Sequence, residues 1–202
     1  MVHEELWQQL DRLDRRQTSQ RAKCQYLSGS EQYIITFLNS QYTVNLIDRA
    51  IVTARPDSKY EPADYLSQLC LLTYLVRAKD LPLADRLVKA ESLPGGLFFF
   101  RGLHEMPTQK LANTFGEKPA QLYEAASRLN AERCEFKDAS VKLYALPRIP
   151  LTFIIWATDE QFAARASILF DSTAHVHLPL DALLAAVTLA VKVLIRSGPK
   201  GS

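Results

Sequence analysis

The sequence predicts an α+β fold, with a single domain over residues 1–202 in which antiparallel hairpins pack with an N-terminal helix, a central buried helix and a C-terminal helix. Three observations favour this fold. Short β-branched and aromatic runs, separated by turn residues, are typical of antiparallel hairpins. Longer segments carry apolar residues at helical spacing. A chain of 202 residues has the usual length of one domain and can bury a sizeable core.

The N-terminal half is expected to contain two helices and a hairpin. Residues 1–25 form an amphipathic helix, because Leu6, Leu10 and Leu13 share one face and charges fill the other. In chain order, the other expected elements are hairpin strands at 33–38 and 42–47, a third extended piece at 50–54 and a helix at 63–79. The helix at 63–79 is apolar on nearly all sides, which is typical of a helix at the centre of a fold.

The C-terminal half is expected to hold short helices, three longer strands and a final helix. In chain order, these are a strand at 86–92, a helical turn at 97–105, helices at 109–115 and 120–130, strands at 139–146, 151–156 and 165–171, a helix at 180–196 and a flexible tail at 197–202. The strand at 151–156 is nearly all apolar, so we expect both of its faces to be buried. The longest charge-free stretch of the last helix, Ala182 to Val191, is about half of the roughly 20 residues that a membrane span needs.

Composition limits the classes of function. The 24 basic and 22 acidic residues leave a formal charge of +2, which gives no long-range attraction to nucleic acid or to an anionic membrane. Cys24, Cys70 and Cys134 are odd in number and widely spaced, as expected of reduced thiols rather than of a disulfide framework. The polar, acidic start lacks the pattern of a signal peptide. These features predict a cytoplasmic protein with neither nucleic acid nor a membrane as partner, and they leave the oligomeric state open.

The first candidate site is the segment from Pro94 to His104. Gly95 and Gly96 precede an expected helix, where backbone N–H groups favour an anion. Arg101 and His104 are three residues apart and are expected on one helical face, so they join the two glycines as candidate ligand-binding residues. The alternative is a tight turn followed by a phenylalanine-rich core segment.

The second candidate is a set of polar residues for which we expect a structural role before a functional one. Asp171 ends a strand, and its carboxylate is expected to accept backbone N–H groups in an Asx-type turn. Arg165 begins that strand; it is expected to pair with Asp159 or Glu160, and it is also a candidate ligand-binding residue. The polar set for which a buried ion-pair network is expected contains Arg101, His104, Arg148, Asp159, Glu160, Arg165, Asp171, His177 and Asp181. Within it, a structural role is expected for Arg148, Asp159, Glu160, Asp171 and Asp181.

The third candidate is the segment His175-Val176-His177. In an extended segment both imidazoles would point the same way, as paired metal ligands do, with Asp171 and Asp181 nearby. Two histidines fall short of the three protein ligands that are usual in a catalytic zinc site, so a structural role is the alternative. No P-loop, GxSxG elbow or HExxH motif is present, and no pattern identifies a cofactor.

An ordered set of short motifs runs through residues 94–181. It comprises Pro94-Gly95-Gly96 with Phe99, Arg101-Gly102-x-His104-Glu105-x-Pro107, Lys137-Asp138-Ala139-Ser140, Leu146-Pro147-Arg148-Ile149-Pro150, Trp156-x-x-Asp159-Glu160-x-Phe162-x-Ala164-Arg165-Ala166, Leu169-Phe170-Asp171-Ser172-Thr173 and His177-Leu178-Pro179-x-Asp181. In this order the motifs resemble a bacterial and archaeal family, domain of unknown function 3786. The resemblance implies no activity. It also implies that Lys137 stands where glycine is common in such relatives.

Three functional hypotheses fit these residues. The first is a domain that binds a small anionic ligand or cofactor, recognised by Arg101, His104 and Arg165. The second is a metal-dependent enzyme that uses His175 or His177 together with an aspartate. The third is a protein-interaction module that docks through the apolar face of the N-terminal helix.

Overall fold

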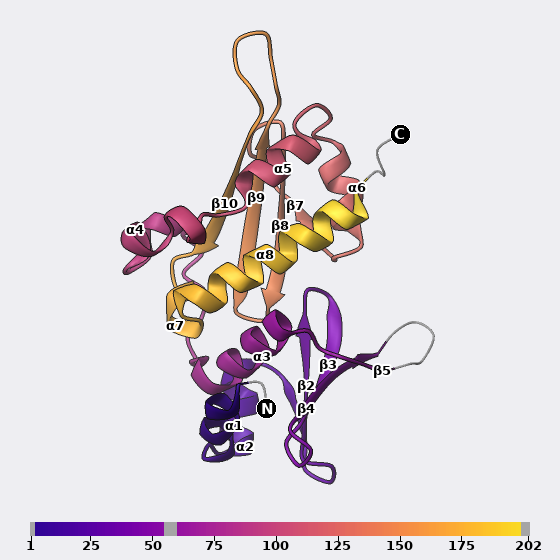
Figure 1. The fold of residues 1–202 in the computed structure, drawn as a ribbon, viewed down its shortest axis with the longest axis vertical. Coiled ribbons are helices and arrows are strands. Elements are labelled where there is room, and N and C mark those ends of the chain that lie inside the picture. Colours follow the sequence, from indigo (N-terminus) through magenta and orange to yellow (C-terminus); the bar gives the residue numbers. More distant parts are fainter. Residues whose placement is uncertain (1–2, 55–59, 199–202) are drawn as a thin grey trace.

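A computed structural model describes residues 3–54 and 60–198 of the chain and confirms the α+β class (Figure 1). The chain forms two five-stranded antiparallel sheets with helices packed against them. The sheet of the N-terminal half lies at one end of the molecule and the sheet of the C-terminal half at the other (Figure 1).

The first sheet has the strand order β1-β2-β3-β4-β5. The elements of this half are α1 (Glu4–Asp11), α2 (Arg15–Ala22), β1 (Gln25–Leu27), β2 (Gln32–Phe37), β3 (Ser40–Asn45), β4 (Ala50–Ala54), β5 (Tyr60–Pro62) and α3 (Tyr65–Arg77). The expected hairpin is confirmed as β2 and β3, which are joined at Leu38 and Asn39 with φ angles of 48° and 61°. Two successive left-handed residues give the tight turn that suits the twist of a hairpin. The expected central helix is α3, in which Leu71 and Leu72 are fully buried.

The predicted single N-terminal helix is wrong, because the segment forms two helices. The Asp14 side chain accepts a hydrogen bond from the Gln17 backbone N–H at 2.8 Å and so caps the start of α2. The Arg15 guanidinium donates to the Leu10 carbonyl at 2.8 Å, which satisfies the end of α1. Trp7 and Leu10 are buried in the chain's own core, so the apolar stripe of the docking hypothesis is already covered.

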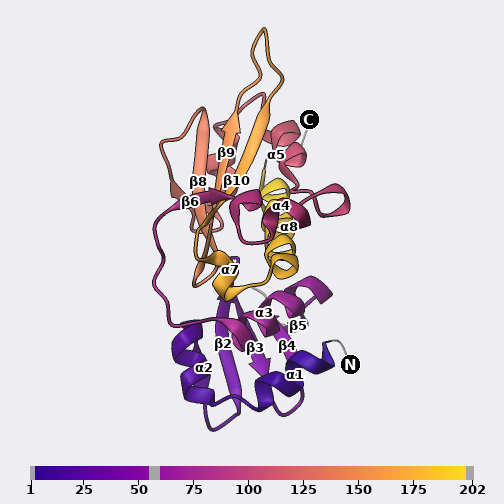
Figure 2. The same cartoon turned by 90° about the vertical axis from the view of Figure 1, so that its left-hand side faces the viewer.

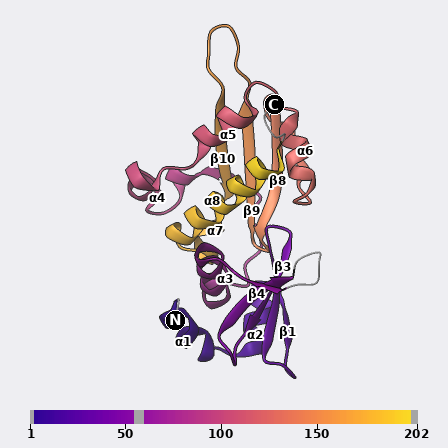
Figure 3. The same cartoon turned by 45° about the vertical axis from the view of Figure 1, so that its right-hand side comes forward.

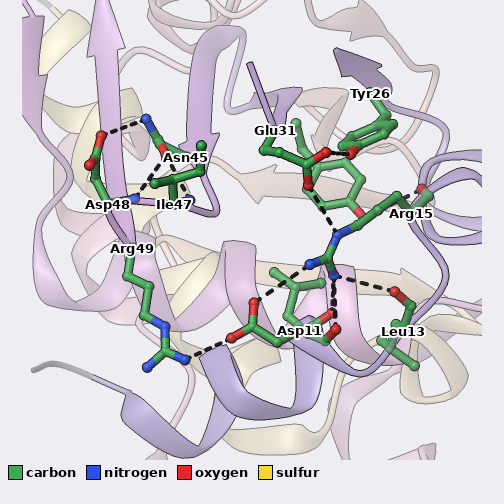
Figure 4. A network of polar contacts seen from close by, with 11 residues as sticks. Asp11, Leu13, Arg15, Tyr26, Glu31, Asn45, Ile47, Asp48 and Arg49 are labelled. Atoms are coloured by element: carbon green, nitrogen blue, oxygen red, sulfur yellow. Dashed lines mark hydrogen bonds and ion pairs between the residues drawn. The ribbon is translucent and has the colours of Figure 1, made fainter. Parts of the chain in front are cut away.

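Charged residues fasten these two helices to the first sheet. Figure 4 shows Arg15 between Asp11 and Glu31, at 3.7 Å and 3.6 Å from their carboxylate oxygens. Arg49, which follows β3, donates to Asp11 at 2.7 Å and also pairs with Glu4. Exposed ion pairs each contribute little to stability. The main effect of this network is therefore to orient α1 and α2 on the sheet.

The second sheet has the strand order β6-β10-β9-β8-β7. The elements of this half are β6 (Leu87–Lys89), the 3-10 turn η1 (Ala90–Ser92), α4 (Gly96–Phe99), the 3-10 turn η2 (Gly102–His104), α5 (Thr108–Phe115), α6 (Gln121–Ser127), β7 (Glu132–Arg133), β8 (Ala139–Leu146), β9 (Ile149–Trp156), β10 (Arg165–Asp171), α7 (Ala174–His177) and α8 (Leu180–Ser197). The strands expected at 139–146, 151–156 and 165–171 and the final helix are confirmed, and residues 151–155 of β9 are buried throughout. The strand expected at 86–92 is confirmed only for Leu87–Lys89, because Ala90–Ser92 form η1. Of the predicted tail, Ser197 belongs to α8, and residues 199–202 lie outside the described residues.

Helices cover only one face of the second sheet. Figures 2 and 3 show α5 and α8 on the same side of β8, β9 and β10. Phe153 and Phe170 point to this side and are fully buried, whereas Tyr144 and Arg165 point to the opposite face and are exposed. We call this opposite side the open face. The helix α8 also packs against α3, which joins the two halves.

Two further expectations concern the chain as a whole. Cys24, Cys70 and Cys134 are all free, as the odd count predicts. Within residues 3–54 and 60–198, no helix is both long enough and apolar enough to cross a membrane.

Candidate functional site

The outer edge of β10 is only partly paired. On its inner side β10 pairs with β9 from Arg165 to Phe170. On its outer side it pairs with β6 only from Leu169 to Asp171, because β6 ends at Lys89 and the chain turns into η1. Residues 165–168 therefore form a free sheet edge, which we call the β10 edge.

Side chains along the β10 edge alternate between the two faces of the sheet. Arg165 and Ser167 point to the open face, and Ala166 and Ile168 point to the face covered by helices, as the period of a strand requires. The burial pattern agrees, because Ile168 is buried and Arg165 is exposed. One cavity lies on each side of this edge.

The cavity on the open face has a volume of about 360 Å³, and we call it the basic cavity. Its lining residues are Lys89, Lys137, Trp156, Arg165, Ala166 and Ser167. Arg165 lies directly across from Trp156 in the ladder of β9 and β10, and its guanidinium carbon is 5.8 Å from the centroid of the indole. The register of β9 and β10 thus brings an arginine and an aromatic ring together, and Lys89 at the end of β6 lines the same cavity.

The basic cavity is lined by three cations and no acid. Within the part of the chain that the structure describes, Lys89, Lys137 and Arg165 form no ion pair. Like charges around one concave surface repel each other and raise the local concentration of anions. Lys137 has a φ of 52°, a left-handed conformation that glycine adopts more easily. This backbone geometry fits the glycine that the family resemblance implies at that position.

The second cavity has a volume of about 370 Å³ and shares Lys89, Ala166 and Ser167 with the first. We call it the mixed cavity, because its other lining residues are apolar, polar and acidic: Ala90, Glu91, Phe100, Glu105, Met106, Thr108 and Ile168. The two cavities meet at the β10 edge. The basic cavity therefore lies on one side of this edge, and a cavity with apolar residues and two acids lies on the other.

The glycines of the first candidate site have a structural explanation. Gly95 has a φ of 78°, in the left-handed region, and precedes the four-residue helix α4. A Cβ on Gly96 would lie 2.0 Å from the carbonyl oxygen of Ala90, so only glycine allows this close approach of α4 to η1. These contacts fix the course of the chain after β6. They do not place either glycine among the residues that line the two cavities.

The prediction that Arg101 and His104 share one helical face is wrong. The helix α4 ends at Phe99, and Arg101 has extended backbone angles before the turn η2. The His104 ring stacks on Phe99 at a centroid distance of 4.5 Å, and Arg101 lies 5.8 Å from the ring centroid of Phe98. Both side chains are on the surface and neither lines the basic cavity.

Arg148 is buried and ion-paired, but its partner is Asp80, an exposed residue outside the predicted polar set. It is 3% exposed, and its Nη2 donates to the Asp80 carboxylate at 2.5 Å. Its Nε donates to the Arg21 carbonyl at 2.7 Å, and its Nη1 donates to the Leu81 carbonyl at 2.6 Å. Arg148 therefore ties the β8–β9 turn to α2 and to the segment after α3, and its position indicates a structural role.

Asp171 forms the predicted Asx-type turn. Its Oδ1 accepts the Thr173 backbone N–H at 2.9 Å, the Thr173 hydroxyl at 2.5 Å and the Ala84 N–H at 3.2 Å. Burial alone would raise the pKa of this carboxyl, but the hydrogen bonds outweigh burial and lower its pKa below the ordinary value. Asp171 thus holds the segment before β6 against the end of β10.

The other acids of the polar motif are not part of a buried network. Asp159 accepts two backbone N–H groups within its own exposed loop, and Asp181 accepts the N–H of Ala182 in the first turn of α8. Glu160 is exposed. Within the described ranges, Arg165 pairs with none of them and lies over Trp156 instead, so the predicted ion pair is wrong.

His175 and His177 lie on the short helix α7 and not on an extended segment, which corrects the geometry expected for paired ligands. The His175 Nδ1 contacts the Ser172 carbonyl at 3.0 Å, and the His177 Nδ1 accepts the Lys79 backbone N–H at 3.3 Å. No group of three or more metal-ligating side chains is found in the part of the chain that the structure describes. Metal binding by these histidines stays a prediction, to be tested by metal analysis of untagged protein.

Five residues of the basic cavity were not singled out from the sequence as ligand-binding: Lys89, Lys137, Trp156, Ala166 and Ser167. Lys137, Trp156 and Ala166 belong to the short motifs, which is the signal that points to them. Lys89 and Ser167 carry no local signal, because their proximity depends on the pairing of β6 with β10.

Comparison with known proteins gives one match. The family described as "Domain of unknown function (DUF3786)" matches residues 14–193. No curated protein and no solved structure matches the chain.

Proposed function

The chain belongs to the DUF3786 family, and from this premise and the geometry of the β10 edge we propose that the domain binds a small anionic molecule in the basic cavity. The observation that carries the proposal is the meeting of Lys89, Lys137 and Arg165 around one cavity without an acid.

The chemistry of the lining residues defines the ligand class. Arginine and lysine form charge-assisted hydrogen bonds with carboxylate and phosphate oxygens, and arginine forms paired ones with either group. Ser167 adds a hydroxyl donor on the same face, and the half-buried Trp156 supplies a flat apolar wall. The volume of about 360 Å³ lies within the usual range of roughly 300–1,000 Å³ for small-molecule sites. A phosphate or polycarboxylate fits these properties.

Binding is favoured over catalysis by the same set of residues. Among the described residues, the lining of the basic cavity includes no histidine, cysteine, aspartate or glutamate, which are the commonest general bases and nucleophiles after activation. Lysine and arginine are cationic at neutral pH and act there as anion partners.

A thermal-shift experiment tests this proposal. Inorganic pyrophosphate and citrate are added to the full chain and to two variants, Lys89→Gln in the cavity and Lys192→Gln on the exposed surface of α8. A ligand at 100 times its Kd stabilises the fold by about 2.7 kcal/mol, which corresponds to a rise in Tm of roughly 5–10 °C for a chain of this size.

We expect this rise in the unchanged chain and in Lys192→Gln, and a smaller rise in Lys89→Gln. The proposal fails if neither anion raises the Tm, or if the two substitutions reduce the rise equally. The second outcome would mean that the anions bind the general positive charge of the surface.

A further inference from the structure

The β10 edge adds a second recognition element to the basic cavity. We infer that the domain binds its anion as part of an extended peptide. This peptide pairs with residues 165–168 of β10 as a new strand, in line with β6. The inference rests on the proposed function, because it uses the basic cavity as the pocket for an acidic side chain of that peptide.

The backbone of the β10 edge is available for pairing. The sheet continues beyond β10 only at Leu169–Asp171, so the outward N–H and C=O groups of residues 165–168 have no strand partner among the described residues. A free edge with unpaired backbone groups is the template on which an extended peptide forms a further strand. Four residues at about 3.3 Å each give a free length of roughly 13 Å.

The described part of the chain does not fill this edge. After Lys89 the backbone turns into η1, where the Ala90 carbonyl accepts the Leu93 N–H at 3.1 Å. The Gly96 Cα also packs closely against the Ala90 carbonyl, which holds α4 next to this turn. A continuation of β6 along β10 is therefore blocked, and the edge is left open to another chain.

The two cavities match the side-chain alternation of an added strand. Successive side chains of a strand point to opposite faces of the sheet. Those on the open face would enter the basic cavity, between Lys89 and Arg165. Those on the other face would enter the mixed cavity, beside Phe100 and Met106. One strand would therefore use both cavities at once.

The charges of the cavities specify the pattern of the peptide. The basic cavity favours a carboxylate, and Glu91 and Glu105 at the mixed cavity disfavour one. Phe100 and Met106 favour an apolar side chain there. The expected partner is an extended segment in which acidic and apolar residues alternate, such as Glu-Val-Glu-Val.

Fluorescence polarisation with labelled six-residue peptides tests the inference on the full chain. The probe alternates glutamate and valine and has blocked ends. The first control has the same composition with three glutamates followed by three valines. Two further controls carry N-methyl groups on the odd or on the even residues, because only alternate N–H groups of an added strand face its neighbour.

We expect the alternating peptide to bind at least about tenfold more tightly than the block peptide, which corresponds to 1.4 kcal/mol. One N-methyl pattern should weaken binding about tenfold and the other should leave it unchanged. Amide hydrogen exchange at residues 165–168 should slow when the alternating peptide binds, because its backbone covers this edge. Arg165→Gln should weaken binding of the alternating peptide, and Lys192→Gln should leave its binding unchanged.

The outcomes separate this inference from the proposed function. If pyrophosphate binds and the alternating peptide does not, the strand addition is wrong and the small-anion site stands. If the block peptide or both N-methyl peptides bind as tightly as the probe, backbone pairing is wrong. If neither pyrophosphate nor any peptide binds, both proposals fall.

Discussion

His177 should make the stability of the fold depend on pH. The side chain is fully buried, and its Nε2 has no hydrogen-bond partner within the described residues. Burial and, to a smaller extent, the nearby charge of Arg148 lower the pKa of this imidazole from 6.5 to about 4, against the opposing effect of Asp171. His177 is therefore neutral in the folded chain at neutral pH, with the proton of the ring on Nε2 because Nδ1 accepts the Lys79 N–H.

The sign and size of the effect come from the two pKa values. The unfolded chain binds a proton at His177 below pH 6.5, and the folded chain does so only below about pH 4. Protonation therefore favours the unfolded state, so stability is fully present above pH 6.5 and is lost as the pH falls toward 4. The loss is about 1 kcal/mol at pH 5.5 and approaches roughly 3 kcal/mol below pH 4.

Urea unfolding at pH 7.5 and 5.5 measures this loss, with His177→Gln as the matched variant. Glutamine does not titrate, and its amide oxygen can accept the Lys79 N–H in place of the imidazole. The comparison of the two proteins isolates the contribution of this one side chain. The free energy of unfolding should fall by about 1 kcal/mol more in the unchanged chain than in the variant. An equal fall in both proteins would refute the reasoning.

Three further tests, two of them with a comparison variant, concern contacts that hold the two halves and the site in place. Arg148→Met should lower the free energy of unfolding by about 1–3 kcal/mol, because the Arg21 and Leu81 carbonyls lose their donor. Asp80→Asn should cost under about 1 kcal/mol, because its amide oxygen can still accept from Arg148. Equal losses in urea unfolding would contradict this. Gly96→Ala should lower the Tm by roughly 5–10 °C, because its Cβ would overlap the backbone carbonyl of Ala90. Gly29→Ala is the control and should leave the Tm unchanged, because no atom lies within 4 Å of its Cβ position. An unchanged Tm in Gly96→Ala would show that the close approach is not needed. Asp171→Ala should cost about 1–3 kcal/mol in the same unfolding assay, and unchanged stability with lost anion binding would instead make Asp171 a site residue.

Much of the fold could be predicted because local patterns carry it. The apolar run at 151–156 predicts a strand that is buried on both faces, and the all-round apolar helix at 63–79 predicts a central one. The N-terminal helix was misjudged because Asp14 continues the polar face of a long helix as well as it caps a new one. Only the three-dimensional position of Arg15 at the end of α1 decides between the two.

The candidate site could be predicted only in part, for a physical reason. Arg165 and Trp156 are paired by the register of two long strands, and Lys89 joins them through a three-residue strand far away in the chain. No periodicity in a single segment reports such pairing. Arg101 and His104, in contrast, have the right local spacing, but α4 ends before both of them.

The most direct test of anion binding at the basic cavity is a tryptophan fluorescence titration with inorganic pyrophosphate. The chain has two tryptophans, and Trp7 is 1% exposed in the core, whereas Trp156 lines the cavity. A saturable change in fluorescence is expected in the unchanged chain, and it should be absent in Trp156→Phe. Half-saturation should need at least about tenfold more ligand in Arg165→Gln, and the same ligand concentration as the unchanged chain in Lys192→Gln. A titration without saturation, or equal weakening by Arg165→Gln and Lys192→Gln, would contradict a specific anion site at the β10 edge.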